Sequence, residues 1–354
     1  MESRMYMDIK SLYLDELKEE MKRLGQPAYR AGQIFEWMHG KLAASYDDMT
    51  NLPKDLRKQL DRQYPLTALR VADSLVSEKD GTVKYLFRLY DERIIESVLM
   101  KYHHGNSVCI SSQVGCRMGC AFCASTIGGR ERDLAASEML DQVYRIQALS
   151  GERVSNVVVM GTGEPLDNYG NLVRFIRILS DPNGINISAR NITVSTCGIP
   201  DKIRMLADEG LPVTLAISLH APNNEIRKKL MPIAREYDLQ QVMDAAGYYF
   251  ERTGRRLTFE YCLIDGINDG EGHAEELSGL VRGLNGHINL IPVNPIKEKS
   301  FSKSNSNKIH KFKNILEKNR INVTIRREMG SDINAACGQL RKRYMEHGGN
   351  LPGT

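Results

Sequence analysis

Three cysteines within one short loop constrain this chain more than any other feature. They lie in Ser111-Ser-Gln-Val-Gly-Cys116-Arg-Met-Gly-Cys120-Ala-Phe-Cys123-Ala, with the spacing CxxxCxxC. Structural zinc usually takes four ligands, and a cubic iron–sulfur cluster normally takes four thiolates. Three thiolates on one [4Fe-4S] cluster therefore leave one iron open, where a small molecule can bind through nitrogen and oxygen. Gly115 and Gly119 would let the loop wrap closely around such a group.

The CxxxCxxC spacing resembles the radical S-adenosylmethionine (SAM) superfamily, in which the ligand of the open iron is SAM. The alternative is a coincidental cysteine-rich loop or a zinc loop, for which the usual second pair of ligands is missing. Seven cysteines in 354 residues do not make a secreted disulfide scaffold. In a reducing compartment such cysteines indicate metal binding or catalysis.

The length allows one large α/β domain and a small accessory domain. The sequence contains no apolar run of ~18 residues, the length that a membrane span needs, and its N-terminus lacks a signal-peptide core. We therefore expect a cytoplasmic protein. The net charge is +4, and residues 297–327 carry ten Lys or Arg against two Glu. This segment is either a phosphate-binding surface or a solvated helix face.

The pattern of apolar residues divides the chain into four segments. Residues 1–65 are predicted to be a helical accessory domain, which serves either RNA docking or simple stabilisation. Residues 66–100 are predicted to be a short β-rich linker, and residues 346–354 a tail. Residues 101–345 alternate strands and helices, with strands expected at 107–112, 156–160, 191–196, 213–219, 257–264, 287–292 and 322–326. The fold class is therefore α/β, a partial (β/α)6 TIM-like barrel.

Polar residues follow several of these strands, at the end where such barrels place their active sites. They are Gly163 and Glu164 after the second strand, Ser195 after the third, Ser218 to His220 after the fourth, and Asn294 after the sixth. Backbone carbonyls of the glycine-rich segment and the Glu164 carboxylate could receive the ammonium group of an amino-acid-like ligand. Each signal is weak alone, and their shared position carries the prediction.

Two further residues are candidates for chemistry. Glu96 lies between Ile94 and Val98 on an apolar strand face, where an acidic side chain is either ion-paired or a general base. Cys337 lies among small residues and is either a nucleophile or a buried inert thiol. We interpret Cys197 and Cys262, which lie in or beside apolar strands, as small core residues.

Five motifs together resemble one family: CxxxCxxC, GTGEPLDN, SLHAPNN, LIPVNP and AACGQL. The family is the bacterial radical-SAM methyltransferases of adenine carbon 2 in 23S ribosomal RNA and transfer RNA, and the resemblance covers nearly the whole chain. Pro165 is typical of this branch, whereas the sister branch that methylates carbon 8 tends to carry alanine there. The sequence departs from the family pattern at Thr162, where methionine is usual, and at Asn334, where aspartate is usual.

The resemblance implies a role for each matching residue. It implies cluster ligation by Cys116, Cys120 and Cys123. It implies SAM binding by Gly163, Glu164, Ser195, Ser218, Leu219, His220 and Asn294. It implies catalysis by Cys337, which is itself methylated, by Cys109, which later pairs with it, and by Glu96, which accepts a proton.

The resemblance also implies a reaction that uses two SAM molecules per turnover. One SAM methylates Cys337, and the other yields a radical that activates this methyl group for addition to the adenine ring. Cys109 then releases the product by forming a transient disulfide with Cys337, so the implied partners are 23S rRNA, tRNA, an electron donor and a disulfide reductant. We expect a monomer. The alternatives are a carbon-8 methyltransferase, a radical-SAM enzyme with a non-RNA substrate, and a zinc-stabilised RNA-binding factor.

Overall fold

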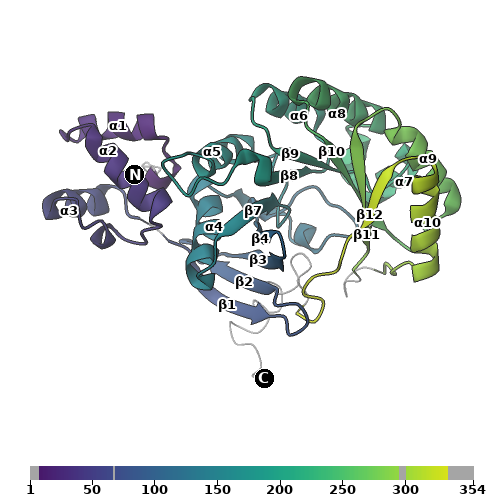
Figure 1. Ribbon diagram of the computed structural model, residues 1–354, viewed down its shortest axis with the longest axis horizontal. Coiled ribbons are helices and arrows are strands. Elements are labelled where there is room, and N and C mark those ends of the chain that lie inside the picture. Colours follow the sequence, from purple (N-terminus) through teal and green to yellow (C-terminus); the bar gives the residue numbers. More distant parts are fainter. Residues whose placement is uncertain (1–7, 67, 295–299, 334–354) are drawn as a thin grey trace.

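A ten-stranded sheet forms the centre of the protein, in a computed structural model that describes residues 8–66, 68–294 and 300–333. The strand order is β1-β2-β3-β4-β7-β8-β9-β10-β11-β12 (Figure 1). The bounds are β1 Arg70–Val76, β2 Val83–Arg88, β3 Ile94–Tyr102, β4 Gly105–Cys109, β7 Val154–Val159, β8 Ile192–Thr196, β9 Thr214–Ser218, β10 Leu257–Leu263, β11 Gly286–Pro292 and β12 Asn322–Ile325. Within this sheet, every neighbouring pair in the order from β4 to β12 is parallel, which confirms the predicted partial barrel.

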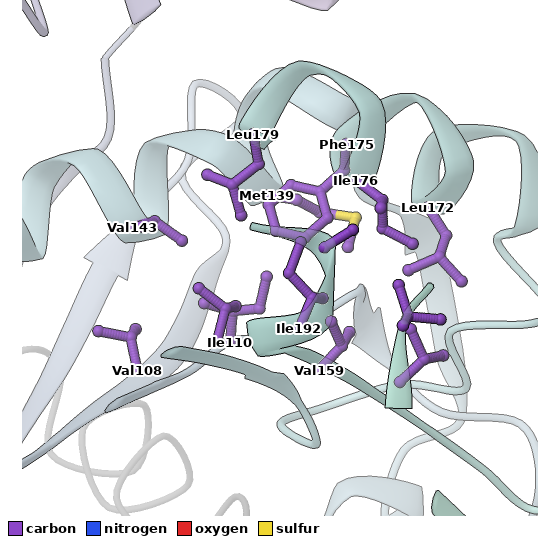
Figure 2. Close-up of a cluster of buried hydrophobic side chains, with 14 of the residues drawn as sticks. Val108, Ile110, Met139, Val143, Val159, Leu172, Phe175, Ile176, Leu179 and Ile192 are labelled. Carbon is purple, nitrogen blue, oxygen red and sulfur yellow. The ribbon is translucent and has the colours of Figure 1, made fainter. Parts of the chain in front are cut away.

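Helices connect the parallel strands and pack along the sheet (Figure 1). They are α4 Ala136–Ser150, α5 Tyr169–Leu179, α6 Pro200–Asp208, α7 Asn224–Leu230, α8 Leu239–Thr253, α9 Glu271–Val281 and α10 Ser306–Lys318. Figure 2 shows the core between α4, α5 and the strands, where Met139 and Phe175 pack over Ile110 and Val159. Burial of these side chains supplies the main favourable free energy of the fold and fixes the positions of the strand ends.

The segment predicted as a β linker continues the main sheet. Strands β1, β2 and β3 pair in antiparallel fashion, and β3 pairs with β4, so that Val98 lies opposite Cys109. Side chains alternate between the two faces of a strand, so Ile95 and Leu99 join the main core while Glu96 and Val98 face the other side. This segment therefore forms one wall of the barrel.

The first 65 residues are helical in their described part, as their apolar spacing predicts. The elements are α1 Leu14–Arg23, α2 Tyr29–Phe35, α3 Lys54–Gln63, a π-helical turn Glu36–Gly40, and short 3-10 turns Ile9–Ser11 and Tyr46–Asp48. Lys10 Nζ lies 2.8 Å from a carboxylate oxygen of Asp141 on α4, and both side chains are almost completely buried. Arg174 on α5 pairs with Glu16 and covers the ring of Tyr13. These contacts fix the helical unit to the barrel.

Two strands lie outside the main sheet. Strand β5, Gln113–Gly115, pairs with β6, Arg130–Asp133, in antiparallel fashion. Further 3-10 turns are Ala124–Thr126, Ala189–Asn191 and Pro232–Arg235. In the part of the chain that the structure describes, no helix has the length and apolar character needed to cross a membrane.

Candidate active site

A cavity of about 540 Å³ lies at the carboxyl ends of the parallel strands. It brings together most of the residues that the sequence singled out. Its walls include Cys109, Cys116, Cys120, Cys123, Gly163, Glu164, Ser195, Ser218, His220 and Asn294. The cavity also receives Val98 and Met100 from β3, so the antiparallel strands complete its wall. Cys337 and Asn334 lie outside the described residues.

The β5–β6 pair frames the cysteine loop. Gly115 ends β5 with a φ of +73°, and a Cβ atom there would overlap the carbonyl oxygen of Gly129. Only glycine combines this backbone angle with this close approach. Farther along the loop, the Ala121 N–H donates to the carbonyl oxygen of Leu230 at 2.8 Å, which ties the loop to the end of α7.

The second half of the GTGEPLDN motif holds the same loop from the other side. Arg117 donates two hydrogen bonds to the Asp167 carboxylate, at 2.8 and 2.5 Å. The side-chain amide of Asn168 donates to the carbonyl oxygens of Ser112 and Leu134 at 2.9 and 2.7 Å. The Arg117 guanidinium lowers the pKa of Asp167, which keeps the carboxylate ionised as an acceptor. Asp167 and Asn168 are therefore positioning residues for the cysteine loop.

The three thiols of the loop fit an iron–sulfur cluster. Burial raises the pKa of Cys116 and of Cys123, and it raises the pKa of Cys120 together with the nearby Cys123 and Cys116 sulfurs. Thiolates in such a place need a cation to offset their charge, and the iron of a cluster would supply it. Within residues 8–66, 68–294 and 300–333, no three His, Cys, Asp or Glu side chains are grouped to hold a single metal ion. The donor set of three cavity-lining thiols is the one that a cluster with an open iron requires.

The glycine-rich segment after β7 lies against the start of the cysteine loop. Gly163 has a φ of +113°, and a Cβ atom there would lie 2.7 Å from Ser112 Oγ. Next to it, the buried Glu164 carboxylate accepts from the Cys197 N–H at 2.7 Å and from the Leu166 N–H at 3.1 Å. Burial raises the pKa of Glu164, while these backbone donors oppose the shift. The carboxylate is fixed in orientation at the cavity wall.

His220 is held in one tautomer at the opposite wall. Its φ is +54°, and its Nδ1 accepts from the Cys262 N–H at 2.9 Å, so the proton of the neutral ring lies on Nε2. Burial lowers the pKa of His220 to about 3, which keeps the ring neutral. The ring of Phe122, which precedes Cys123 in the cysteine loop, forms a T-shaped contact with the His220 ring, with centroids 4.8 Å apart. His220 thus offers a hydrogen-bond donor close to the cysteine loop.

Of the predicted site residues within the described part of the chain, Leu219 and Glu96 do not line the cavity. The Leu219 side chain is fully buried in the main core, and its N–H donates to the Glu260 carbonyl oxygen at 3.1 Å, so any contact with a ligand would use its backbone. Glu96 is buried, and its carboxylate lies 3.4 Å from Lys84 Nζ. An ion pair at Glu96 was one of the two sequence interpretations. Glu96 also lies two residues from the cavity-lining Val98, on the same face of β3.

Sequence reasoning missed several residues at the site. Cys197 and Cys262 are buried, as expected of core residues, but both also line the cavity. Arg227 on α7 is completely buried and donates to the Cys197 carbonyl oxygen at 2.6 Å, although an arginine in a polar helix predicts a surface position. Glu260 on β10 is a buried, cavity-lining carboxylate. The sequence signal that could have identified Glu260 is an acidic residue within an apolar strand, which is the same signal that identified Glu96.

Comparisons with known proteins show which family this chain resembles. The model of the radical SAM superfamily matches residues 110–277, and the model of the ribosomal RNA large subunit methyltransferase N-terminal domain matches residues 7–65. A protein of Lachnoclostridium phytofermentans named "Probable dual-specificity RNA methyltransferase RlmN" is 63% identical over 96% of each chain. A protein of the same name from Lachnospira eligens is 61% identical over 96% of this chain and 97% of its own.

A solved structure of similar size has the same fold. It is a radical SAM methyltransferase from Sphaerobacter thermophilus, with a TM-score of 0.90 and 46% sequence identity. It covers 94% of this chain and 98% of its own length. The likeness extends over both the helical unit and the barrel with its cysteine loop, so the chain belongs to the family of the radical SAM RNA methyltransferases named RlmN.

Proposed function

We propose that this enzyme methylates carbon 2 of adenosine in 23S rRNA, at the peptidyl transferase centre, and in tRNA, next to the anticodon. The observation that carries the proposal is a shared cavity. Cys109, a thiol outside the cluster motif, lines the same cavity as Cys116, Cys120 and Cys123. Cys197 and Cys262 also line this cavity but are buried, whereas Cys109 is partly exposed, which supports a reactive role for Cys109 rather than a packing role.

Carbon 2 of adenine is electron-poor and has no lone pair, so it cannot attack the methyl group of SAM directly. When bound by the three cysteines, a [4Fe-4S] cluster supplies the electron that cleaves SAM and so gives access to radical chemistry. The methyl group is carried by the protein: the Cys337 thiolate takes it from one SAM by displacement. One hydrogen atom leaves this methyl group before its carbon joins carbon 2. The ring adduct then loses one proton and one electron, and the electron would return to the cluster. The Cys109 thiolate attacks the Cys337 sulfur and a disulfide forms, while the bond from that sulfur to the transferred carbon breaks and the carbon takes the electron pair and a proton to become the methyl group.

Glu96 is the proposed acceptor of the proton that leaves carbon 2. Glu96 lies on the same face of β3 as Val98, and Val98 lines the cavity. Lys84 Nζ lies 3.4 Å from the Glu96 carboxylate. Glu96→Gln keeps the size of the side chain and removes the basic oxygen, so we expect the RNA-linked intermediate to accumulate in this variant.

The thiol roles predict opposite outcomes for two variants. Cys337→Ala should abolish methylation, because no sulfur carries the methyl group. Cys109→Ala should leave the enzyme covalently joined to RNA, seen as a shifted band in a denaturing gel. Met205→Ala, at an exposed position on α6, is the matched control and should methylate normally. Normal turnover by Cys109→Ala would show that the resolving role is wrong.

Mass spectrometry of nucleosides tests the position and the substrate. RNA from cells with and without the gene should differ in 2-methyladenosine, in both 23S rRNA and tRNA. A carbon-8 product would assign the enzyme to the sister branch, and unchanged RNA would indicate a non-RNA substrate. The proposal places the enzyme in the cytoplasm as a monomer, with an electron donor for the cluster and a reductant for the disulfide.

A further inference from the structure

Glu260 is a buried carboxylate that the proposed mechanism does not use. It lies in the middle of β10 with 4% of its surface exposed, and it lines the cavity together with Cys262 two residues later. The intervening Tyr261 packs into the main core on the other face. A buried carboxylate is costly unless its oxygens have partners. An acid at this place in an apolar strand therefore needs an explanation.

Half of the carboxylate has a structural partner. The side-chain amide of Asn289, on the neighbouring β11, donates to Glu260 Oε2 at 2.9 Å, and Thr324 on β12 donates to Asn289 Oδ1 at 3.3 Å. Among the described residues, no group donates to Oε1. This oxygen is not sealed in the protein interior either, since the residue borders the cavity. Oε1 is thus an acceptor available to a bound molecule.

The groups next to Glu260 indicate which hydrogen-bond donors a ligand of Oε1 must carry. Ser218 pairs with Glu260 in register on the adjacent strand, and it also lines the cavity. Adjacent strands lie about 4.8 Å apart, so a carboxylate acceptor and a hydroxyl stand side by side. Burial raises the pKa of Glu260, while the charge of Arg326 opposes the shift. A ligand with neighbouring hydroxyl donors fits this pair, and a phosphate does not, because it would be repelled by the carboxylate.

We propose that Glu260 binds the ribose of SAM and accepts hydrogen bonds from its 2′- and 3′-hydroxyl groups through Oε1. A ribose within RNA carries phosphates on both sides, which the Glu260 carboxylate would repel. The adenosyl group of SAM carries no phosphate, so we assign the bound ribose to SAM and not to RNA. Arg326 and Arg327, which could attract RNA phosphates, lie at exposed positions of the same cavity. The inference rests on the SAM chemistry of the proposed function.

The test measures binding of SAM and of its 2′-deoxy and 3′-deoxy analogues, without RNA, to the full-length enzyme loaded with its cluster under anaerobic conditions. A hydrogen bond to a charged group corresponds to a factor of about 10 to 100 in affinity. The wild type should therefore prefer SAM over each analogue by about that factor. Glu260→Ala should lose most of its SAM affinity and bind all three compounds almost equally. Glu260→Gln, which preserves the shape and a partner for Asn289, should lie in between.

A control separates ligand binding from a structural role. Thr324→Val breaks the bond to Asn289 from the exposed side of the same network and should keep the wild-type preference for SAM. Equal weakening of all three compounds by Glu260→Ala, with iron content unchanged, would overturn the inference in favour of a purely structural carboxylate. So would wild-type SAM affinity in Glu260→Gln with weakened tRNA binding. Failure of the wild type to bind SAM at all would instead refute the proposed function.

Discussion

Gly163→Ala tests whether close packing between two strand-end loops shapes the cavity. Gly163 follows β7, and its φ of +113° is strained for any residue with a side chain. The added Cβ would lie 2.7 Å from Ser112 Oγ and from Gln113 Cβ, and 2.8 Å from the Gln113 backbone nitrogen. Because the last of these atoms is backbone, a rotamer change cannot relieve the clash. One of the two loops must move.

Two costs add in this variant. A residue held at an unfavourable φ costs roughly 1–3 kcal/mol, and overpacking in a close-packed interior costs roughly 1–3 kcal/mol. The free energy of unfolding should therefore fall by about 2–6 kcal/mol, as measured by urea denaturation of the protein without its cluster. Affinity for SAM in the cluster-loaded enzyme should fall as well, since Glu164 and the cysteine loop both adjoin the displaced segment.

Gly170→Ala is the matched control. Gly170 lies in α5, and a Cβ atom there would meet nothing within 4 Å. Alanine in a helix is more stable than glycine by roughly 0.5–1 kcal/mol, so this variant should be slightly stabilised and should bind SAM normally. Wild-type stability and wild-type SAM affinity in Gly163→Ala would refute the argument that the two loops need a glycine to meet.

Three further predictions concern charge and metal. Burial lowers the pKa of His39, which hydrogen-bonds Tyr144, to about 3, so between about pH 3 and 6.5 the unfolded state binds a proton that the folded state does not. The free energy of unfolding should therefore rise with pH in that window, and less steeply in His39→Gln; equal slopes would contradict this. Arg327→Ala should lower the salt dependence of RNA binding by about one phosphate contact, whereas Lys311→Ala, whose ammonium pairs with Glu271, should not; identical slopes for both would exclude the cavity mouth as a phosphate site. Cys120→Ser should lose most of its iron, measured per chain after anaerobic reconstitution, and full iron content would remove this cysteine from the ligand set.

Much of the barrel could be predicted because its strands are short, apolar and separated by helices with regular spacing. The strand predicted at 257–264 is observed at Leu257–Leu263, and the one predicted at 322–326 at Asn322–Ile325. The cavity could be anticipated because parallel strands end at one edge, so Glu164 and His220 had to approach each other.

Other parts carry too little local signal to be predicted. Strand β5 has three residues, and its glycine and glutamine suggest a loop rather than a strand. The lysines of the basic segment left open a phosphate-binding surface or a solvated helix face. In the structure Lys303, Lys308 and Lys313 form ion pairs with carboxylates of the same protein. The role of Asp167 in holding Arg117, fifty residues earlier, depends on a contact that exists only in the folded chain.

The contact between the helical unit and the barrel, which includes the buried ion pair of Lys10 and Asp141, has a consequence for how the enzyme would handle a folded RNA. Apolar side chains of both parts, such as Ile34 and Met139, belong to one hydrophobic core, so separation of the helical unit from the barrel would expose apolar surface to water and is disfavoured. The helical unit and the barrel would then keep a fixed distance and orientation when RNA binds. An RNA that touches both parts must already have the right span, or must bend until it does.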